Sequence, residues 1–306
     1  MAAVLSISQE TLTSGNAWDD GFEKALKYDV TTADASPNAD SYARITQRFE
    51  KGDLALFKKG TSNAETYTLA FWVKATKTGT QIVELMDQVN TRHCCASYTI
   101  SVTNTWEHKV LNFAADTSGA LGAGTGLGME VNFVLEAGTN YTSGTLATAW
   151  ASQTAANIAV GQVNNFDSTS NNFHITGIQL EVGTYTSSDL PPFRHESYGE
   201  NLRRCQRYYQ TVGGVAGTAN SSTTGYWAGN YIVNMRATPT GTLSNTSMMI
   251  NNGTNNITGS GCTLNFYNSD EAGFFIGIDG FNTMGGNQAI VFRYPDAHYL
   301  ELTAEL

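Results

Sequence analysis

The chain has 306 residues, of which 41% are hydrophobic and only 14% are charged, so Thr, Ser, Asn and Gln supply most of its polarity. This apolar content excludes a chain that is mainly disordered. The 17 Lys and Arg against 27 Asp and Glu give a net charge of −10, and no basic stretch offsets it locally. Such a balance argues against nucleic acid and anionic membranes as partners. The N-terminus lacks the basic start of a signal peptide, and no apolar run is long enough for a membrane helix.

Period-two alternation of apolar residues recurs along the chain and predicts an all-β protein. The clearest strand is Tyr67–Val73, which carries apolar groups on both faces, as expected for a strand covered on both sides. Short strands separated by Gly, Asn, Ser and Asp favour a sandwich or jelly roll over a parallel α/β arrangement. The other predicted strands are Ser97–Val102, Trp106–Phe113, Met129–Glu136, Phe173–Val182, Tyr226–Met235, Thr263–Tyr267, Phe274–Ile278 and Ala289–Tyr294.

A change in composition around residues 183–198, which includes Pro191 and Pro192, predicts the main domain boundary. We expect a jelly roll over residues 1–186, a linker and helix over residues 187–212, and a smaller β domain over residues 213–306. The helix is predicted over Glu196–Tyr209, packed as a spacer between two β units, with an apolar face formed by Tyr198, Leu202, Cys205 and Tyr209. The C-terminal β domain is short, and we expect that it scarcely closes a core of its own.

The four cysteines do not form a disulfide framework. Cys94 and Cys95 are adjacent, and a bridge between neighbours is strained, whereas Cys205 and Cys262 are isolated. We therefore expect four free thiols that are buried or half-buried.

Three segments carry a resemblance to a known family. Residues 175–183 (ITGIQLEVG) are followed by Pro192-Phe193-Arg194 and then by residues 200–210 (ENLRRCQRYYQ). The chain thereby resembles bacteriophage tail-fibre and related virion structural proteins, in which a similar strand precedes a Pro-Phe turn and a Cys-Gln-Arg-Tyr-Tyr helix end. Looser matches at residues 67–75, 235–240 and 303–306 extend the resemblance over most of the chain. The motif residues, for which we expect structural roles, are Gln179, Glu181, Gly183, Phe193, Leu202, Cys205, Gln206, Arg207, Tyr208 and Tyr209.

The resemblance implies an N-terminal jelly roll similar to carbohydrate-binding modules, a linking helix and a smaller C-terminal β domain, made in the bacterial cytoplasm and assembled onto a phage particle. The implied roles are host-surface recognition and virion architecture, with other virion proteins and further copies of the chain, expected as a homotrimer, as partners. Arg203 and Arg204 stand where the family has an apolar pair, which predicts a different neighbour for this helix.

Glycan recognition would use flat aromatic rings together with amide and carboxylate groups. Trp72 and Trp106 lie in predicted strands and are expected in the core, whereas Trp18, Trp150 and Trp227 lie in loop-like or strand-edge sequence. These last three are the candidate glycan-binding residues, with packing or subunit contact as the alternative.

No catalytic site is predicted, and we expect a non-enzymatic protein. A polysaccharide depolymerase would need two carboxylates about 5–10 Å apart, and Glu84, Glu130, Glu136 and Glu181 lie in or near predicted strands. Glu130 and Glu136 share a face if their strand is regular. For Glu181, a buried hydrogen-bonding role at the domain junction is the expectation. The sequence has no Gly-x-Ser-x-Gly motif, and the Gly-rich residues 122–128 lack the Lys of a phosphate-binding loop.

No cofactor is predicted. His93-Cys94-Cys95 is a tight group of zinc-type ligands, but adjacent cysteines seldom face one ion. A structural calcium ion is compatible with a jelly roll, and Asp19, Asp20, Asp116 and Asp167 are its candidate ligands, although their spacing matches no calcium motif.

Three hypotheses follow for the function. The first is a tail fibre that binds host glycan without enzymatic activity, the second an architectural head or collar protein without a receptor, and the third a polysaccharide depolymerase.

Overall fold

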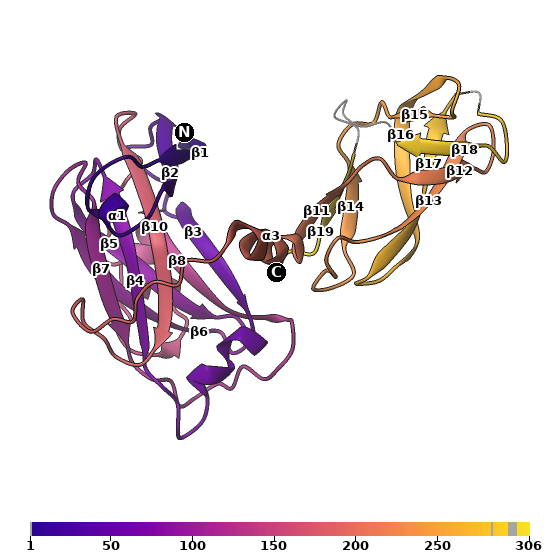
Figure 1. The fold of residues 1–306 in the computed structure, drawn as a ribbon. Helices are drawn as coiled ribbons and strands as arrows, with labels where there is room; N and C mark the ends of the chain where they lie inside the picture. The colour runs from indigo at the N-terminus through magenta and orange to yellow at the C-terminus, as the bar shows by residue number, and fades with distance from the viewer. Residues whose placement is uncertain (1, 283, 293–298) are drawn as a thin grey trace. The chain divides into compact units, whose positions relative to one another are not determined.

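The computed structural model describes residues 2–282, 284–292 and 299–306 and divides into two compact units between Phe193 and Arg194 (Figure 1). The division falls inside the segment 187–212, so that Phe193 packs with the N-terminal unit and the helix belongs to the C-terminal unit. Within the described part of the chain, no helix is long and apolar enough to cross a membrane.

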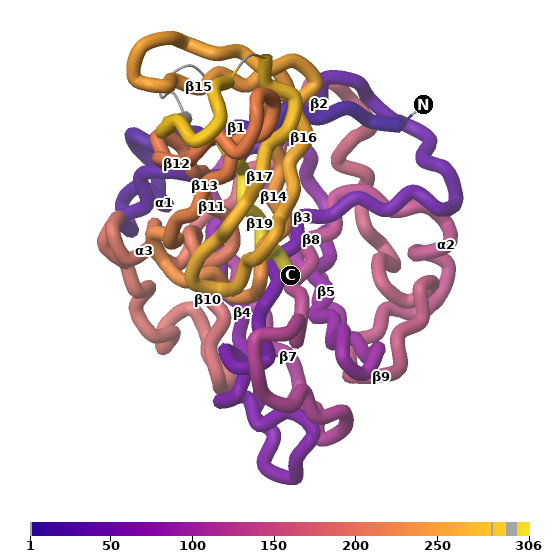
Figure 2. Tube along the Cα trace, turned by 90° about the vertical axis from the view of Figure 1, so that its right-hand side faces the viewer, coloured from indigo at the N-terminus to yellow at the C-terminus, as the bar shows by residue number. Residues whose placement is uncertain are grey.

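The N-terminal unit consists of two five-stranded antiparallel sheets, so the predicted all-β sandwich is confirmed. The chain changes sheet between β2 and β3, β3 and β4, and β4 and β5, and again on both sides of β7, as in a jelly roll (Figure 2). The first sheet has the order β1 (Val4–Thr11), β2 (Lys24–Thr32), β10 (Asn172–Val182), β4 (Tyr67–Ala75) and β7 (Glu107–Phe113). The second has the order β3 (Tyr42–Glu50), β8 (Leu127–Ala137), β5 (Gly79–Asp87), β6 (Arg92–Ile100) and β9 (Ala151–Ser152). Short helical turns lie in the connections between strands: α1 (Asn16–Asp19), η1 (Gly52–Phe57), α2 (Thr139–Thr142) and η2 (Ala155–Asn157).

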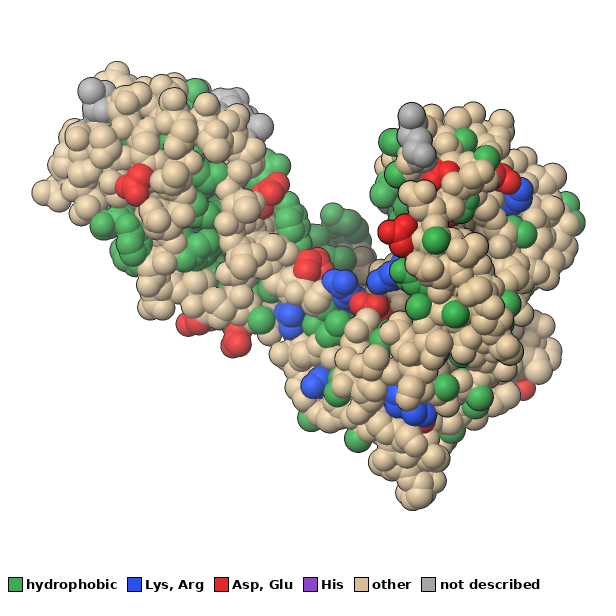
Figure 3. All heavy atoms as spheres, turned by 180° about the vertical axis from the view of Figure 1, so that it is seen from behind, with side chains coloured by type: hydrophobic (Ala, Val, Ile, Leu, Met, Phe, Trp, Pro, Cys, Tyr) green, Lys and Arg blue, Asp and Glu red, His purple; other side chains and the backbone are tan. Residues whose placement is uncertain are grey.

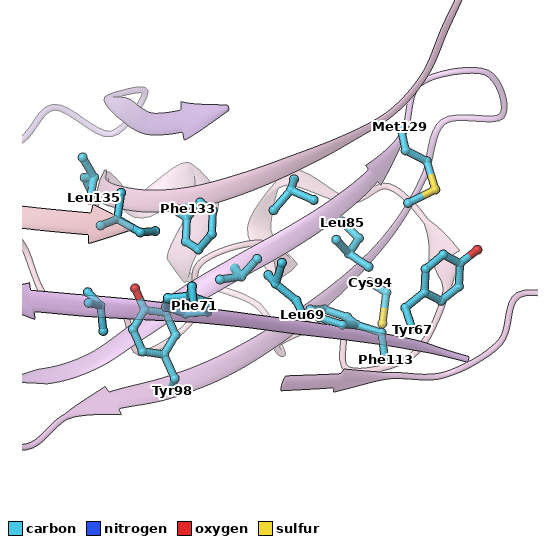
Figure 4. Packing of buried hydrophobic residues seen from close by; sticks show 14 of the residues in the cluster. Tyr67, Leu69, Phe71, Leu85, Cys94, Tyr98, Phe113, Met129, Phe133 and Leu135 are labelled. Carbon is cyan, nitrogen blue, oxygen red and sulfur yellow. The ribbon is translucent and has the colours of Figure 1, made fainter. Parts of the chain in front are cut away.

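The core between the two sheets follows from the alternation in β4. Tyr67, Leu69, Phe71 and Val73 are fully buried on one face of this strand, pointing toward the other sheet. The ring of Phe71 lies edge-on to Phe133 on β8, with ring centroids 5.0 Å apart, so the two layers interlock through aromatic contacts (Figure 4).

Both sheets are also covered on their outer faces. Trp72 and Trp106, buried as predicted, pack with Phe22 and Phe193 over the first sheet. On the second sheet, Ile82, Cys95 and Val134 lie beneath the segment that contains Ile158 and Ala159. Strands β4, β5 and β8 are therefore buried almost throughout their length.

The C-terminal unit contains one helix, one small sheet and a closed barrel among its described residues. α3 (Tyr198–Gln206) precedes a three-stranded sheet of β11 (Tyr209–Val212), β19 (Leu300–Thr303) and β14 (Thr240–Leu243). The six-stranded barrel has the order β12 (Ala216–Ala219), β13 (Thr224–Asn230), β17 (Gly273–Phe281), β16 (Asn256–Ser269), β15 (Met249–Asn251) and β18 (Ala289–Phe292).

The expectation that this unit scarcely closes a core of its own is wrong. Trp227, Ile276 and Ile278 lie fully buried inside the barrel together with Phe281. Glycine makes this possible, since a Cβ atom on Gly225 would lie 2.3 Å from Trp227 Cη2. A barrel of short strands thus closes around one large indole, which composition alone does not reveal.

The predicted strands are found with shifted ends. The predicted strand Ser97–Val102 matches β6 only as far as Ile100, where β6, which begins at Arg92, ends; residues 263–267 are the middle of the long strand β16. β13 ends at Asn230 and not at Met235, and the last residues of the predicted strand Ala289–Tyr294 lie outside the described residues.

A buried ion network joins the loop before β4 to the second sheet. The Lys59 ammonium has no exposed surface and lies 2.5 Å from Asp87 Oδ2 and 2.9 Å from Asp116 Oδ2. Arg92 binds both oxygens of Asp116 at 2.9 Å. Burial alone would raise the pKa of Asp116, but hydrogen bonds from Arg92 and Lys59 hold that pKa below its usual value.

Replacing Lys59 by Ala should therefore destabilise the protein strongly, because the buried Asp87 loses its ammonium partner, while Asp116 keeps its pairing with Arg92. We expect a loss of about 3–5 kcal/mol in the free energy of unfolding, measured by urea denaturation. Lys58→Ala is the matched control, because the neighbouring Lys58 pairs with Glu65 at an exposed site and should cost less than about 1 kcal/mol. Equal losses for the two variants would contradict this interpretation.

Candidate functional site

The three candidate tryptophans have three different environments. Trp227 is only 1% exposed inside the barrel, so its prediction as a glycan-binding residue is wrong. Trp150 is half-buried: its indole Nε1 donates to Ala114 O at 2.8 Å, and its ring lies 4.9 Å from Lys59 Nζ. Trp18, in α1, is 38% exposed and stays a candidate. The structure does not bring these three side chains together into one site.

The first group of residues with predicted structural roles, Gln179 to Phe193, fixes the end of β10 to the segment that leaves the N-terminal unit. The Gln179 amide donates to Glu181 Oε1 at 3.0 Å and to Pro191 O at 2.9 Å. Gly183 has a φ of 111°, which favours glycine, and its backbone N–H donates to Thr66 O. Phe193 then packs edge-on against Phe22, with 4.8 Å between ring centroids. These residues hold the chain in place at its exit from the sandwich.

The second group of these residues lies in α3 and at the start of β11. The carbonyls of Gln206, Arg207 and Tyr208 accept hydrogen bonds from Gln210, Arg236 and Ala304, which anchors the end of the helix to the small sheet. Leu202, Cys205 and Tyr209 are exposed instead. The expectation of a buried or half-buried thiol is therefore wrong for Cys205, while Cys94, Cys95 and Cys262 are buried.

Glu84, His93 and Cys95 form a buried cluster on the outer face of the second sheet. Their ligand atoms lie within 4.8 Å of one another, and His93 Nδ1 is 3.0 Å from Glu84 Oε1. The other carboxylate oxygen of Glu84 accepts from the Tyr42 hydroxyl and the Asn132 amide at 3.2 Å. The sequence predicts His93 and Cys95 as possible metal ligands but Glu84 only as a possible depolymerase carboxylate; pairing of β5 with β6 places Glu84 opposite Cys95.

This cluster is best interpreted as a structural hydrogen-bond network. The backbone N–H of Thr154 points at His93 Nε2 at 3.4 Å, which favours the tautomer with its proton on Nδ1, donated to Glu84. Cys94 faces the core on the other side of the sheet and cannot join. Burial is the main cause that raises the pKa of the Cys95 thiol, with the Glu84 carboxylate adding to it, so a reactive thiolate is disfavoured.

Three of the four candidate carboxylates of a depolymerase, those of Glu84, Glu130 and Glu181, are engaged in hydrogen bonds. Glu130 is 2% exposed and accepts from Arg48 and Gln88, while Glu84 belongs to the buried cluster. Glu130 and Glu136 lie on one face of β8, as expected for a regular strand, because the residues between them alternate into the core. Among the described residues, Glu136 Oε2 has no hydrogen-bond partner.

The candidate calcium ligands are not gathered at one place in the described structure. Asp116 binds Lys59 and Arg92, whereas Asp167 pairs with Lys77 and accepts from Asn171. Asp19 and Asp20 are exposed at α1. No calcium site is assembled from these four residues.

The most prominent exposed aromatic group lies on the outer face of the barrel. Tyr226, Tyr267 and Phe275 contact one another, with ring centroids 5.4, 5.5 and 5.7 Å apart. Tyr267 is 52% exposed and Phe275 39%. We call these three residues the aromatic cluster. Figure 3 shows hydrophobic side chains gathered among mostly uncharged ones on one face of the C-terminal unit.

The aromatic cluster is built into the barrel wall and bordered by polar groups. Tyr267 lies over Gly277, where a Cβ atom would be 2.5 Å from its Cε2 atom, so only glycine leaves room for the ring. Asp279 accepts from Thr224 at 2.5 Å and from the Asn265 amide at 2.9 Å. The Asn220 amide donates to the Tyr226 hydroxyl at 3.1 Å. The cluster therefore combines accessible ring surface with ordered hydrogen-bonding groups.

The sequence contained a signal for the aromatic cluster. In β13 and β17, Trp227, Phe274, Ile276 and Ile278 point into the barrel, so alternation places Tyr226 and Phe275 outside. Which of the two faces is buried could not be decided before the barrel was known to close.

The comparisons with known proteins are sparse. No family model and no curated protein matches the chain. Among solved structures, the chain is similar to the enzymatically active domain of tailspike protein 4 of bacteriophage CBA120, with 16% sequence identity and a TM-score of 0.27. That match covers 58% of this chain and 19% of the tailspike chain. A likeness at this TM-score carries no argument about function.

The environment of Glu136 predicts a pH dependence of stability. Burial, together with the nearby Asp34 carboxylate, raises the pKa of Glu136. When a carboxyl has a higher pKa in the folded protein than in the unfolded chain, the free energy of unfolding falls as the pH rises from the unfolded pKa through the folded pKa. Glu136→Gln should therefore stabilise the protein at pH 7 and lose this advantage near pH 3, where the carboxyl is protonated in both the folded and the unfolded chain. Urea denaturation at both pH values measures this, with the exposed Glu23→Gln as control. An advantage that is equal at both pH values would contradict the prediction.

Proposed function

We propose that the protein is a bacteriophage virion structural protein, namely a tail fibre, that recognises glycan on the host surface without cleaving it. The sequence resemblance to tail-fibre proteins supports the virion role. The observation that carries the glycan role is the aromatic cluster of Tyr226, Tyr267 and Phe275, bordered by amide and carboxylate groups. In this proposal the N-terminal sandwich is the scaffold of the fibre, held by its own buried core.

The aromatic cluster has the chemistry that a sugar ring requires. The apolar C–H face of a pyranose can pack against the exposed ring of Tyr267, as apolar groups pack on aromatic faces elsewhere. Sugar hydroxyls can donate to Asp279 and exchange hydrogen bonds with Asn220 and Asn265 at the border of the cluster. Among the side chains that form these bordering hydrogen bonds, one is a carboxylate and none is basic. This favours an uncharged glycan over a strongly acidic one.

A single shallow site of this kind binds weakly. Several copies on one particle would raise the apparent affinity through effective concentration without any new contact. Recognition by a virion protein present in several copies is therefore compatible with a modest affinity at each aromatic cluster.

The proposal predicts that truncating the exposed rings weakens glycan binding. The probe is an array of purified bacterial surface polysaccharides, followed by calorimetry with the polysaccharide that binds best. Tyr267→Ala and Phe275→Ala should each weaken binding about tenfold, equivalent to about 1.4 kcal/mol, because the stacking surface is lost. Leu56→Ala is the control, since it removes an exposed apolar side chain from the other unit, and Trp18→Ala tests the remaining tryptophan candidate.

The same experiment separates the three hypotheses. Release of new reducing ends from the bound polysaccharide would identify a depolymerase. Binding to no polysaccharide, with antibody label on the head or collar of intact particles in electron microscopy, would identify an architectural protein. Binding that depends on Trp18 and not on Tyr267 would contradict the assignment of the aromatic cluster.

A further inference from the structure

The loop between β15 and β16 contains the one Asn-Gly pair of the sequence, Asn252-Gly253. Asn251 and Asn256 pair at the base of this loop, and the backbone N–H of Asn252 donates to Asn255 O at 3.2 Å, so that residues 252–255 close a tight hairpin. Asn252 is half-buried, and the three residues that follow it are exposed. The Asn-Gly pair is therefore held in one conformation within reach of water.

The side chain of Asn252 is folded back along this loop. Its Oδ1 atom accepts hydrogen bonds from the backbone N–H groups of Thr254 at 3.1 Å and of Asn255 at 2.7 Å. Asn side chains stabilise turns in this way by bonding to the backbone a few residues further on. Because both donors follow Gly253 in the chain, the side-chain amide of Asn252 runs alongside the backbone nitrogen of Gly253.

Two backbone donors at one carbonyl oxygen favour a reaction at that carbonyl. When a nucleophile attacks Cγ of Asn252, Oδ1 takes up negative charge, and N–H groups already aimed at Oδ1 stabilise that charge. The nucleophile at hand is the nitrogen of Gly253, whose N–H donates to Asn251 Oδ1 at 2.7 Å. Gly253 has a φ of 88°, and even a Cβ atom at this position would meet nothing within 4 Å, so that the approach is not obstructed.

We propose that Asn252 deamidates by its own chemistry, with the backbone N–H groups of Thr254 and Asn255 as the donors that stabilise the oxyanion. The Gly253 nitrogen loses its proton to hydroxide and bonds to Cγ of Asn252. The bond between Cγ and Nδ2 then breaks, and ammonia leaves with a proton from water, which completes a five-membered succinimide ring. Water opens either carbonyl of this ring and leaves aspartate or isoaspartate at position 252.

The reaction adds a negative charge to an uncharged part of the barrel. The loop borders a hollow of about 400 Å³, and the polar side chains among its described lining residues are all amides or hydroxyls; the lining is Asn252, Asn255, Asn256, Ile257, Thr258 and Asn282. Aspartate at position 252 places a carboxylate in this lining. The inference goes beyond the proposed glycan function, because the loop contains no residue of the aromatic cluster or of its polar border.

The first test follows the full chain by peptide mass spectrometry during incubation at pH 6 and at pH 8. The fragment with residue 252 should become heavier by the difference between a hydroxyl and an amino group, and faster at pH 8, because the Gly253 nitrogen must lose its proton. Asn252→Gln should abolish the change, since glutamine would have to close a larger ring. Asn255→Gln is the matched control, because only the backbone N–H of Asn255 takes part, and it should convert like the wild type. Thermal unfolding of both variants checks that they are folded.

The second test isolates the contribution of the two N–H donors. A synthetic peptide of residues 248–258 contains the same Asn-Gly pair without the folded loop. Conversion in the folded chain should be faster than in this peptide, by on the order of tenfold, because donors fixed around a developing oxyanion lower the barrier to attack. Conversion in the folded chain that is no faster than in the peptide, or a chain that does not convert at residue 252, would overturn the proposal, whatever the outcome of the glycan array.

Discussion

Burial of β4 on both faces is the constraint on which the N-terminal unit depends. A strand that carries Tyr67, Leu69 and Phe71 on one side and Trp72 on the other needs an apolar layer above and below it. The facing sheet supplies one layer. The other comes from the loop with α1 and from Phe193, so the chain leaves this unit only after it has covered β4. The hydrogen bond from the Gln179 amide to Pro191 O then has a physical explanation. It holds the segment that brings Phe193 into place.

The fold class could be predicted from the sequence because two-sided and alternating strands leave a strong local pattern. The strand Tyr67–Val73, its pairing partner Phe173–Val182 and the strand Met129–Glu136 of the facing sheet are of this kind. The barrel could not be predicted, because its closure depends on contacts between distant strands and on glycines such as Gly225 that admit Trp227. For the same reason Trp227 was assigned to the surface, although its neighbour Tyr226 is the residue that lies outside.

The candidate site was missed for a related reason. Trp residues attract attention in a search for sugar-binding surfaces, yet Trp72, Trp106 and Trp227 are buried and Trp150 donates to Ala114, which leaves Trp18 as the exposed tryptophan. The rings of the aromatic cluster belong to tyrosine and phenylalanine, and only the register of β13, β16 and β17 brings Tyr226, Tyr267 and Phe275 into contact. The apolar face of the helix could be predicted from its spacing, and its residues Leu202 and Cys205 are exposed.

The low charge of the chain connects these surfaces. With 14% charged residues, most recognition must use apolar contact and neutral hydrogen bonds, and such interactions are little affected by salt. Charge is instead concentrated in a few structural places, such as the buried pair of Lys59 and Asp87. The amides of Asn220 and Asn265 beside the aromatic cluster follow the same rule. In the proposed function, these neutral groups and the exposed rings would hold an uncharged glycan through contacts that added salt weakens little, because screening acts on exposed charges.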